Sequence, residues 1–252
     1  MTGTDDLARV LRRLRLSGVL QTLDLRQRQA ADENLAASEF LFRVLQDEVE
    51  RRDGKKLQDR LTRAGFEHER TLEVFNWTFN PKVPKARIID LATARFVDLH
   101  ENVLFIGPAG VGKSHLAQAL GHRAVRRGHE VLFITAPRMF AELRAGRGDG
   151  SYERRLARFC DVDVLIIDDL GLMPLRADEP ADLYEIVRQR YEHGAMILTS
   201  NRDIEELPPL FGDPLLASAA MDRLLHHGHV VAIEGDSYRN PPPTRRGARA
   251  TA

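Results

Sequence analysis

The chain has 252 residues, of which 43% are hydrophobic, and its 37 basic and 37 acidic residues leave no formal net charge. This composition suits a globular protein of one or two domains, and it excludes nucleic-acid binding through overall positive charge, so such binding needs local clusters. No apolar stretch approaches the roughly 20 residues of a membrane helix. Asp5 and Asp6 argue against a signal peptide. Cys160 is the single cysteine, which excludes an intrachain disulfide. We therefore expect a cytoplasmic protein with no membrane association.

The first part of the chain has the apolar spacing of helices. From Leu7 to about Asn76, hydrophobic residues recur every three or four positions, as they do on one face of a helix. Pro81 and Pro84 then interrupt the pattern and mark a linker. We predict a small all-α amino-terminal domain over residues 1–78 that binds DNA or a partner.

Beyond the linker, short apolar runs alternate with helical segments. In chain order we expect strand 103–106, helix 113–127, strand 131–135, a helix near Met139, strand 164–167, helix 181–192, strand 196–199, helix 215–226 and strand 230–233. This alternation predicts an α/β fold with a central parallel sheet flanked by helices. We assign residues 79–239 to this domain. Residues 240–252 have too little apolar content to fold, so we predict a disordered tail.

A glycine-rich loop follows the first of these strands. Residues 107–114 are Gly-Pro-Ala-Gly-Val-Gly-Lys-Ser, the full pattern of a phosphate-binding loop between a strand and a helix. In such a loop, backbone N–H groups and the positive end of the helix bind phosphate oxygens, while the lysine adds charge and the hydroxyl binds Mg²⁺. The sequence therefore predicts a nucleoside triphosphate site formed by Gly107, Pro108, Ala109, Gly110, Val111, Gly112, Lys113, Ser114 and His115.

Polar residues end two later strands. Asp168 and Asp169 end one apolar run, and Asn201 follows the next. Because carboxyl ends of parallel strands line a ligand crevice, we expect Asp168 to hold Mg²⁺ together with Ser114. Asp169 would act as general base on the attacking water, which Asn201 would also bind. The alternatives are an ordinary turn after the two aspartates and, for Asn201, a helix cap for the segment that begins at Asp203.

Five motifs occur in an order that is typical of one family. They are Gly-Pro-Ala-Gly-Val-Gly-Lys-Ser-His-Leu-Ala, Leu-Ile-Ile-Asp-Asp-Leu-Gly, Leu-Thr-Ser-Asn-Arg, Met-Asp-Arg-Leu-Leu-His-His and Asp-Ser-Tyr-Arg. Over nearly its whole length the chain resembles IstB-type transposition helper ATPases, which are AAA+ ATPases related to the DnaC helicase loaders. The resemblance implies an AAA+ fold and a homo-oligomer that uses ATP and Mg²⁺ on duplex DNA. It also implies a partner, an IstA-type transposase that the protein recruits or activates in insertion-sequence transposition, a form of DNA recombination.

The same resemblance implies roles for two arginines. Arg223 matches an arginine finger that reaches the nucleotide of the neighbouring subunit, and Arg239 matches a second sensor that contacts the γ-phosphate in cis. A guanidinium in either place would stabilise charge on the transferred phosphoryl group. Each arginine could instead be a surface ion-pair partner. Asp169 stands where many AAA+ proteins have glutamate, and its shorter side chain predicts slow hydrolysis that DNA or a partner stimulates.

A cluster of arginines precedes the aspartate pair. Gly146, Gly148 and Gly150 are expected to divide this segment into two short helices. We predict that the guanidinium groups contact DNA phosphates without regard to base sequence. The alternative is a solvated helical face paired with Glu142 and Glu153. The predicted DNA-binding residues are Arg138, Arg144, Arg147, Arg154, Arg155 and Arg158.

Three other functions are compatible with these motifs. A replicative helicase loader of the DnaC type has the same ATPase core and differs only in its partner. A phosphotransferase would use the loop to phosphorylate a small acceptor, although Asn201 and Arg223 argue against it. A scaffold that binds DNA and senses ATP without hydrolysing it stays open because of Asp169. The transposition helper is the function that we expect.

Overall fold

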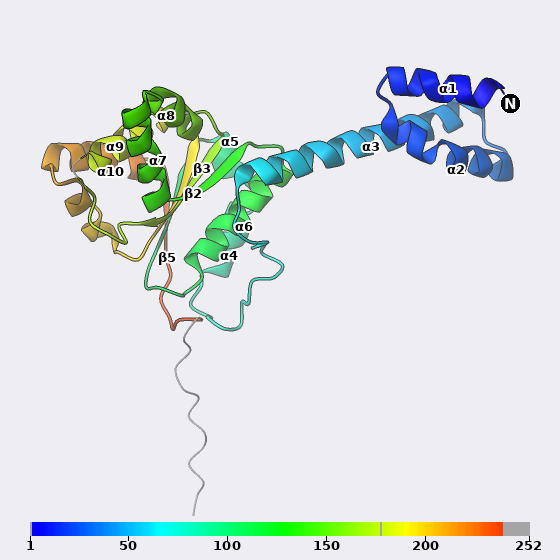
Figure 1. Ribbon diagram of the computed structural model, residues 1–252. Helices are drawn as coiled ribbons and strands as arrows, with labels where there is room; N and C mark the ends of the chain where they lie inside the picture. The colour runs from blue at the N-terminus through cyan, green and yellow to red at the C-terminus, as the bar shows by residue number, and fades with distance from the viewer. Residues whose placement is uncertain (1, 177, 239–252) are drawn as a thin grey trace, which may run out of the picture. The chain divides into compact units, whose positions relative to one another are not determined.

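The computed structural model describes residues 2–176 and 178–238 of the chain (Figure 1). Contacts divide the chain into two compact units, Met1–Asp59 and Arg60–Ala252, so the division falls inside helix α3 (Ala37–Ala64). The expected boundary near residue 78 differs from this division, and the functional assignment of residues 1–78 and 79–239 stays a prediction. The tail predicted over residues 240–252 lies outside the described residues.

Helical structure ends earlier than the apolar spacing predicted. Helix α3 ends at Ala64, and Gly65 follows with a φ of +70°, which glycine adopts at little cost. Residues 65–84 contain neither helix nor strand. Their apolar side chains are used in tertiary packing instead, as when Phe66 stacks on His122 with ring centroids 4.2 Å apart. The predicted helix up to Asn76 is therefore wrong beyond residue 64.

Three helices form the amino-terminal unit. They are α1 (Thr2–Arg13), α2 (Ser17–Glu33) and the first part of α3. Two carboxylates of α3 tie the helices together. Asp47 accepts two hydrogen bonds from Arg26, and the buried Glu48 accepts one from the Gly18 N–H and also pairs with neighbouring arginines of α3. The small apolar core comes from all three helices and contains Leu11, Val19, Leu23 and Val44.

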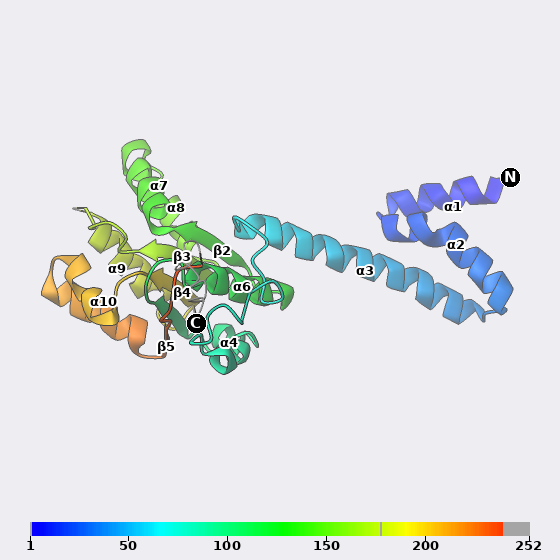
Figure 2. The ribbon, with the colours of Figure 1, turned by 90° about the horizontal axis from the view of Figure 1, so that it is seen from below.

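A five-stranded sheet forms the centre of the second unit (Figure 2). All neighbouring strands are parallel and their order is β2-β3-β4-β1-β5, which confirms the predicted fold class. Strand β4 therefore lies between β1 and β3, and the carboxyl ends of these three strands meet at one edge of the sheet. The strands are β1 (Asn102–Ile106), β2 (Val131–Thr135), β3 (Val164–Leu170), β4 (Ala195–Ser200) and β5 (Gly228–Ala232).

Helices cover both faces of this sheet. Leu165 and Ile167 of β3 belong to a core that includes apolar residues of α7, α8, α9 and α10. Ile166 points the other way, towards α6, where a Cβ added to Gly121 would lie only 2.6 Å from its Cδ1 atom. The helices are α4 (Lys85–Leu91), α5 (Arg95–Asp98), α6 (Lys113–Arg126), α7 (Ala136–Asp149), α8 (Tyr152–Cys160), α9 (Glu179–Arg190), α10 (Pro214–Leu225) and the 3-10 helices η1 (Ile204–Glu206) and η2 (Pro208–Phe211).

Two further observations concern the helices. Of the three glycines expected to divide the arginine-rich segment, only Gly150 separates α7 from α8, with a φ of +71°, whereas Gly146 and Gly148 lie inside α7. Within the described ranges, no helix combines the length and the apolar character that crossing a membrane requires.

Candidate functional site

The glycine-rich loop connects the end of β1 to the start of α6. The loop glycines have positive φ values, which residues other than glycine rarely adopt. These values are +135° for Gly107, +83° for Gly110 and +104° for Gly112. A Cβ on Gly107 would also lie 2.0 Å from the Ile233 carbonyl oxygen. The backbone conformation and the close contact with Ile233 both require glycine at position 107. The loop backbone curls around the amino-terminal end of α6.

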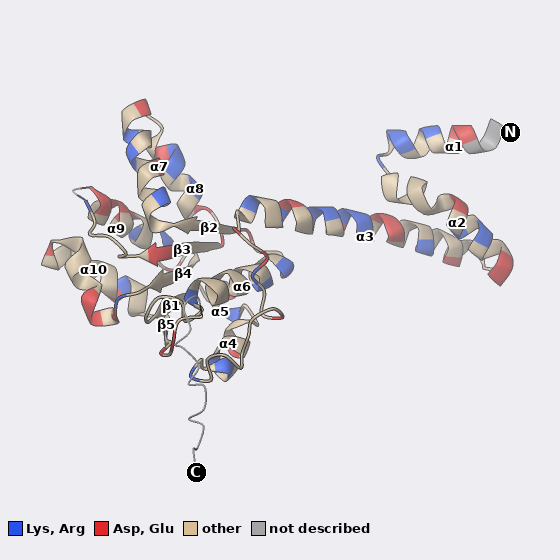
Figure 3. Ribbon diagram, turned by 60° about the horizontal axis from the view of Figure 1, so that its bottom comes forward, with Lys and Arg blue, Asp and Glu red and all other residues tan. Residues whose placement is uncertain are grey.

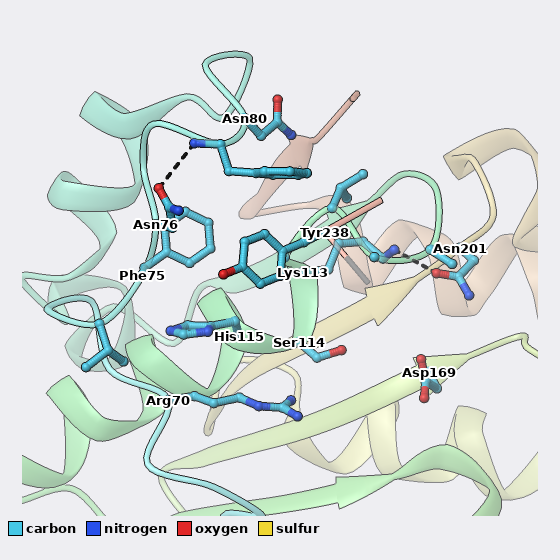
Figure 4. Close-up of a pocket in the computed structure, with 16 residues that line it drawn as sticks. Arg70, Phe75, Asn76, Asn80, Lys113, Ser114, His115, Asp169, Asn201 and Tyr238 are labelled. Carbon is cyan, nitrogen blue, oxygen red and sulfur yellow. Dashed lines mark hydrogen bonds between the residues drawn. The ribbon is translucent and has the colours of Figure 1, made fainter. Parts of the chain in front are cut away.

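Lys113 connects this loop to the end of β4. The side chain is buried, and its Nζ donates to the carbonyl oxygens of Gly107 and Pro108, each at 2.7 Å. It also donates to Asn201 Oδ1 at 2.6 Å (Figure 4). Asn201 therefore lies in the predicted site. Its alternative role as a helix cap is not observed, because the side chain of Asp203 caps η1.

The aspartates at the end of β3 are held by a residue that the sequence analysis did not identify. Thr199 of β4 donates its hydroxyl to Asp168 Oδ1 and accepts a hydrogen bond from the Asp169 N–H at 3.0 Å. Thr199 and Asp168 are both buried. Asp169 has a φ of +58° and lines the pocket beside the loop. Thr199 lies in β4 two residues before the predicted Asn201, which follows that strand, and this position was the available signal.

A pocket of about 320 Å³ lies against the loop and contains Lys113, Ser114, Asp169 and Asn201. Its other wall comes mainly from residues 70–80, which the sequence analysis considered only as a linker. The ring of Phe79 meets that of Tyr238 edge to face at 4.8 Å. The alternation of aromatic residues and asparagines before Pro81 could have indicated this wall, whose side chains include Arg70, Val74, Phe75, Asn76, Phe79 and Asn80.

These residues fit a nucleotide with its metal ion. The loop offers backbone N–H groups and a lysine for phosphates, and the wall of residues 70–80 offers aromatic faces for a base. Ser114 lines the pocket, and Asp168 is buried next to Asp169 in the chain, so the two would supply hard oxygen ligands, which Mg²⁺ prefers. This ion takes few protein ligands besides phosphate oxygens and water. The donor set therefore suits Mg²⁺ although the described residues include no group of three acidic, histidine or cysteine side chains that could hold a metal by themselves.

His115 lines the pocket, and its ring contacts the wall of residues 70–80. Its Nε2 lies 2.8 Å from the Thr71 carbonyl oxygen, which only accepts hydrogen bonds, so this nitrogen carries a proton. Its ring also meets Phe75 edge to face at 5.1 Å. Burial lowers the pKa of His115 below its usual value, so the ring is neutral near pH 7. Any contact of His115 with phosphate would thus come from its backbone N–H, and its part in binding stays a prediction.

Arg223 lies at the opposite edge of the sheet from the loop. It belongs to the last turn of α10, and its carbonyl oxygen lies 3.4 Å from the side-chain amide of Asn102, the first residue of β1. The five residues of β1 separate it from Gly107, which is about 16 Å of strand. Arg223 donates to the Ala219 carbonyl oxygen, and none of the described carboxylates pairs with it. Arg239, the predicted second sensor, lies outside the described residues.

The guanidinium of Arg223 also contacts two aromatic rings. It lies 5.7 Å from the ring centroid of Tyr184 and 5.9 Å from that of Tyr191. These contacts hold a cation at the surface without neutralising it. The predicted alternative, a surface ion pair, is therefore not found for Arg223 within the described part of the chain.

Most of the arginines predicted to bind DNA pair with carboxylates of the same chain. Figure 3 marks the basic positions of α7 and α8 in blue. Arg147 forms a two-pronged contact with the buried Asp182, to which Tyr152 also donates, so this arginine holds α7 against α9. Arg154 is exposed, and no described carboxylate forms an ion pair with it. The other pairs are Arg138 and Arg158 with Glu142, Arg144 with Glu179, and Arg155 with Asp149.

These ion pairs affect which arginines of the cluster are accessible to DNA phosphates. The pairing with Glu142 that the alternative interpretation expected is present, whereas Glu153 takes part in no ion pair within the described chain. Arg138, Arg144, Arg154 and Arg158 remain exposed on α7 and α8, where surface pairs cost little to exchange for phosphate. Contact with DNA stays a prediction for all six arginines.

Comparison with known proteins gives matches over most of the chain. A family model described as IstB-like ATP binding protein matches residues 9–245. A protein of Mycobacterium tuberculosis (strain ATCC 25618 / H37Rv), named as an ATP-binding protein in an insertion sequence, is 41% identical over 247 residues, which cover 98% of this chain and 97% of the relative. One of Pseudomonas aeruginosa, named as an ATP-binding protein of insertion sequence IS21, is 38% identical over 234 residues, 93% of this chain and 88% of the relative.

Solved structures show the same fold. The DnaC helicase loader superimposes with a TM-score of 0.54 over 66% of this chain and 99% of that chain, at 21% sequence identity. At this identity the similarity concerns the fold alone. It agrees with the expected fold of a central parallel sheet flanked by helices.

Proposed function

We propose, from the premise that the chain belongs to the IstB-like ATP-binding proteins, that it is a DNA-dependent ATPase that regulates a transposase in insertion-sequence transposition. The predicted family, the P-loop ATPase class and the binding of ATP are confirmed by this membership. The names of the relatives mention ATP binding and insertion sequences only. Binding of DNA, assembly into oligomers and contact with a transposase are therefore part of the proposal.

The observation that carries the proposal is that Lys113 joins the loop after β1 to Asn201 after β4, in a pocket that Asp169 of β3 also lines. Its ammonium lies between the loop carbonyls and Asn201 Oδ1, from where it can reach phosphate oxygens with little rearrangement. Asp169 would accept a proton from the attacking water, which Asn201 would orient. Mg²⁺, held by Ser114 and Asp168, would supply positive charge to the phosphate oxygens.

Arg223 supports hydrolysis that depends on assembly. Its guanidinium cannot complete the site of its own chain, because the length of β1 separates the two. A cation held on tyrosine rings with no carboxylate partner in the described chain is suited to a phosphate of another subunit. We propose that Arg223 acts as the arginine finger of a neighbouring site, which makes turnover rise with oligomerisation. Arg239 is proposed as the sensor in cis from its motif alone.

DNA is proposed to bind along α7 and α8. The exposed arginines there contact phosphates in this scheme, whereas Arg147 serves the fold through Asp182. Exchange of a surface carboxylate for a phosphate conserves the arginine's charge contact. The proposed affinity is independent of base sequence and falls steeply with salt. The amino-terminal unit is proposed to bind DNA or the partner protein.

A DnaC-type helicase loader is the second candidate. The similarity in fold to the DnaC helicase loader favours it, but the same core serves both functions. Relatives that are named for insertion sequences and match 98% and 93% of the chain favour the transposition helper. Only the partner separates the two, so the protein should be captured by a transposase of an insertion sequence and not by a hexameric helicase.

The test of the proposal is ATP hydrolysis with and without duplex DNA. We expect DNA to stimulate turnover, Lys113→Ala to abolish it, and Arg223→Ala to lower it by about 10³-fold or more while nucleotide affinity is kept. Arg188→Ala is the matched control, because Arg188 is an exposed arginine of α9 whose ion pair, among the described carboxylates, is with Glu185. Mixing Arg223→Ala with Lys113→Ala protein should restore part of the activity if the arginine acts on a neighbouring subunit.

Three results would contradict the proposal. Turnover that does not change when DNA is added would contradict the proposal of a DNA-dependent ATPase. A protein that stays monomeric with a non-hydrolysable ATP analogue would contradict the proposed assembly. Full activity of Arg223→Ala would contradict its proposed role as an arginine finger. For the DNA surface, Arg154→Ala should weaken binding to DNA of any sequence and reduce the salt dependence by about one charge. Unchanged binding of Arg154→Ala would exclude this arginine from the surface.

A further inference from the structure

Arg70 extends a second basic side chain into the nucleotide pocket (Figure 4). It belongs to the segment of residues 65–84, which precedes the sheet in the chain. Its half-buried side chain lines the same cavity as Lys113, Ser114 and Asp169. No motif used to predict the site includes this residue.

The backbone around Arg70 is fixed by contacts with α6. On one side, Phe66 stacks on His122 at 4.2 Å, and the Arg70 N–H donates to the His68 carbonyl oxygen at 2.8 Å. On the other side, the carbonyl oxygen of Thr71 accepts a hydrogen bond from His115 at 2.8 Å. The guanidinium is thus carried by an anchored segment, so its backbone loses little conformational entropy when the side chain binds.

The charges around Arg70 favour an anion. Within the described chain, no carboxylate forms an ion pair with its guanidinium. The pocket also contains Lys113 and the amino-terminal end of α6, and Asp169 is the one acidic side chain among its described lining residues. Two cations and a helix dipole against one carboxylate leave the cavity positive. The charge of Arg70 also contributes to the lowered pKa of His115, for which burial is the main cause.

We propose that Arg70 binds the α- and β-phosphates of the nucleotide in cis, as a second cation beside Lys113. The assignment to these phosphates follows from the neighbours of Arg70. Thr71 contacts His115, which follows Ser114 at the start of α6, where loop N–H groups bind the α- and β-phosphates. Asn201 and Asp169, which face the γ-phosphate in the proposed function, come from other strands. The inference rests on the nucleotide site of that function and adds a contact that ATP and ADP share.

The test is the affinity of Arg70→Gln for ATP and for ADP, measured with fluorescent analogues of both in the full chain. A lost charge-assisted contact predicts weaker binding by about ten-fold to a hundred-fold, equal for the two nucleotides. Arg127→Gln is the matched control, since Arg127 is an exposed arginine that follows the far end of the same helix, α6. Arg70→Lys should recover part of the affinity and keeps the test valid if the glutamine variant is unstable.

Each alternative role of Arg70 gives a different result. Equal affinities for Arg70→Gln and Arg127→Gln overturn the proposal, and so does a loss confined to ATP, which would make Arg70 a γ-phosphate sensor. A lower melting temperature without nucleotide, together with unchanged affinity, would show a packing residue. If the unmodified protein binds neither nucleotide, the proposed function itself fails, which distinguishes that failure from the failure of Arg70.

Discussion

Replacing Thr199 with valine removes one hydroxyl and leaves nearly the same shape. That hydroxyl donates to Asp168 Oδ1 and accepts from the Asp169 N–H, so one substitution affects both aspartates of the site. Thr199 is fully buried and Asp168 nearly so. Water therefore cannot easily replace the lost contact to the carboxylate, and the substitution tests whether β4 positions the end of β3.

The magnitude follows from the two hydrogen bonds. A hydrogen bond to a charged acceptor contributes about 1.5–3 kcal/mol, and a partly buried N–H that loses its acceptor costs about 1 kcal/mol when water can reach it. We expect Thr199→Val to lower the free energy of unfolding by about 2.5–4 kcal/mol. For hydrolysis, loss of a residue that orients a metal ligand typically costs about 10–100-fold. The Mg²⁺ concentration that gives half-maximal turnover should rise with it.

The assay combines urea unfolding with hydrolysis across a range of Mg²⁺ concentrations. Thr199→Ser is the control, because it keeps the hydroxyl and loses only a methyl group, and it should stay close to the unmodified protein in its Mg²⁺ dependence. Wild-type Mg²⁺ dependence in Thr199→Val would refute the reasoning that Thr199 positions Asp168. A larger loss in Thr199→Ser than in Thr199→Val would point to packing of the methyl group instead.

Other substitutions test the fold. Gly121→Ala should destabilise the second unit by about 1–3 kcal/mol, because its Cβ would lie 2.6 Å from Ile166. In Gly148→Ala of α7 the added Cβ meets no atom within 4 Å, so this variant should be more stable by up to about 1 kcal/mol. Urea unfolding that ranks the two variants the other way would contradict the packing of α6. Hydrogen bonds from Arg26 and Arg51 lower the pKa of Asp47 and of Glu48 to about 2. Because the folded state favours the ionised forms, their stabilisation is complete above about pH 5 and is lost as the pH falls towards 2. Circular dichroism during acid titration should show helix loss in this range, less steeply in Glu48→Gln, and a helical signal unchanged down to pH 2 would contradict it.

The parts of the site that follow one another in the chain could be predicted from the sequence. The loop around Lys113 and the pair Asp168 and Asp169 each sit at the end of an apolar run, and the period of such runs indicates strands without knowledge of their neighbours. Asn201 was predictable for the same reason. Parallel order then brings the three strand ends to one edge.

The parts that depend on distant contacts could not be predicted. Residues 65–76 have helical spacing, but Gly65 ends the helix and Phe66 packs on His122, more than fifty positions later. Local spacing does not record such a contact. Thr199 and Arg70 were missed similarly, because their roles depend on side chains from other elements. The paired state of Arg147 depends on Asp182 of α9, which no local pattern indicates.

The position of Arg223 at the far edge of the sheet from Gly107 gives direction to any assembly that joins the two. Subunits connected in this way repeat head to tail, and a contact of this kind either closes into a ring or continues as an open filament. An open assembly has two unlike ends, one with a nucleotide site that no arginine completes and the other with an arginine that serves no site. A partner that recognises either feature would bind one end only, and the orientation of the assembly on DNA would decide on which side that partner is placed.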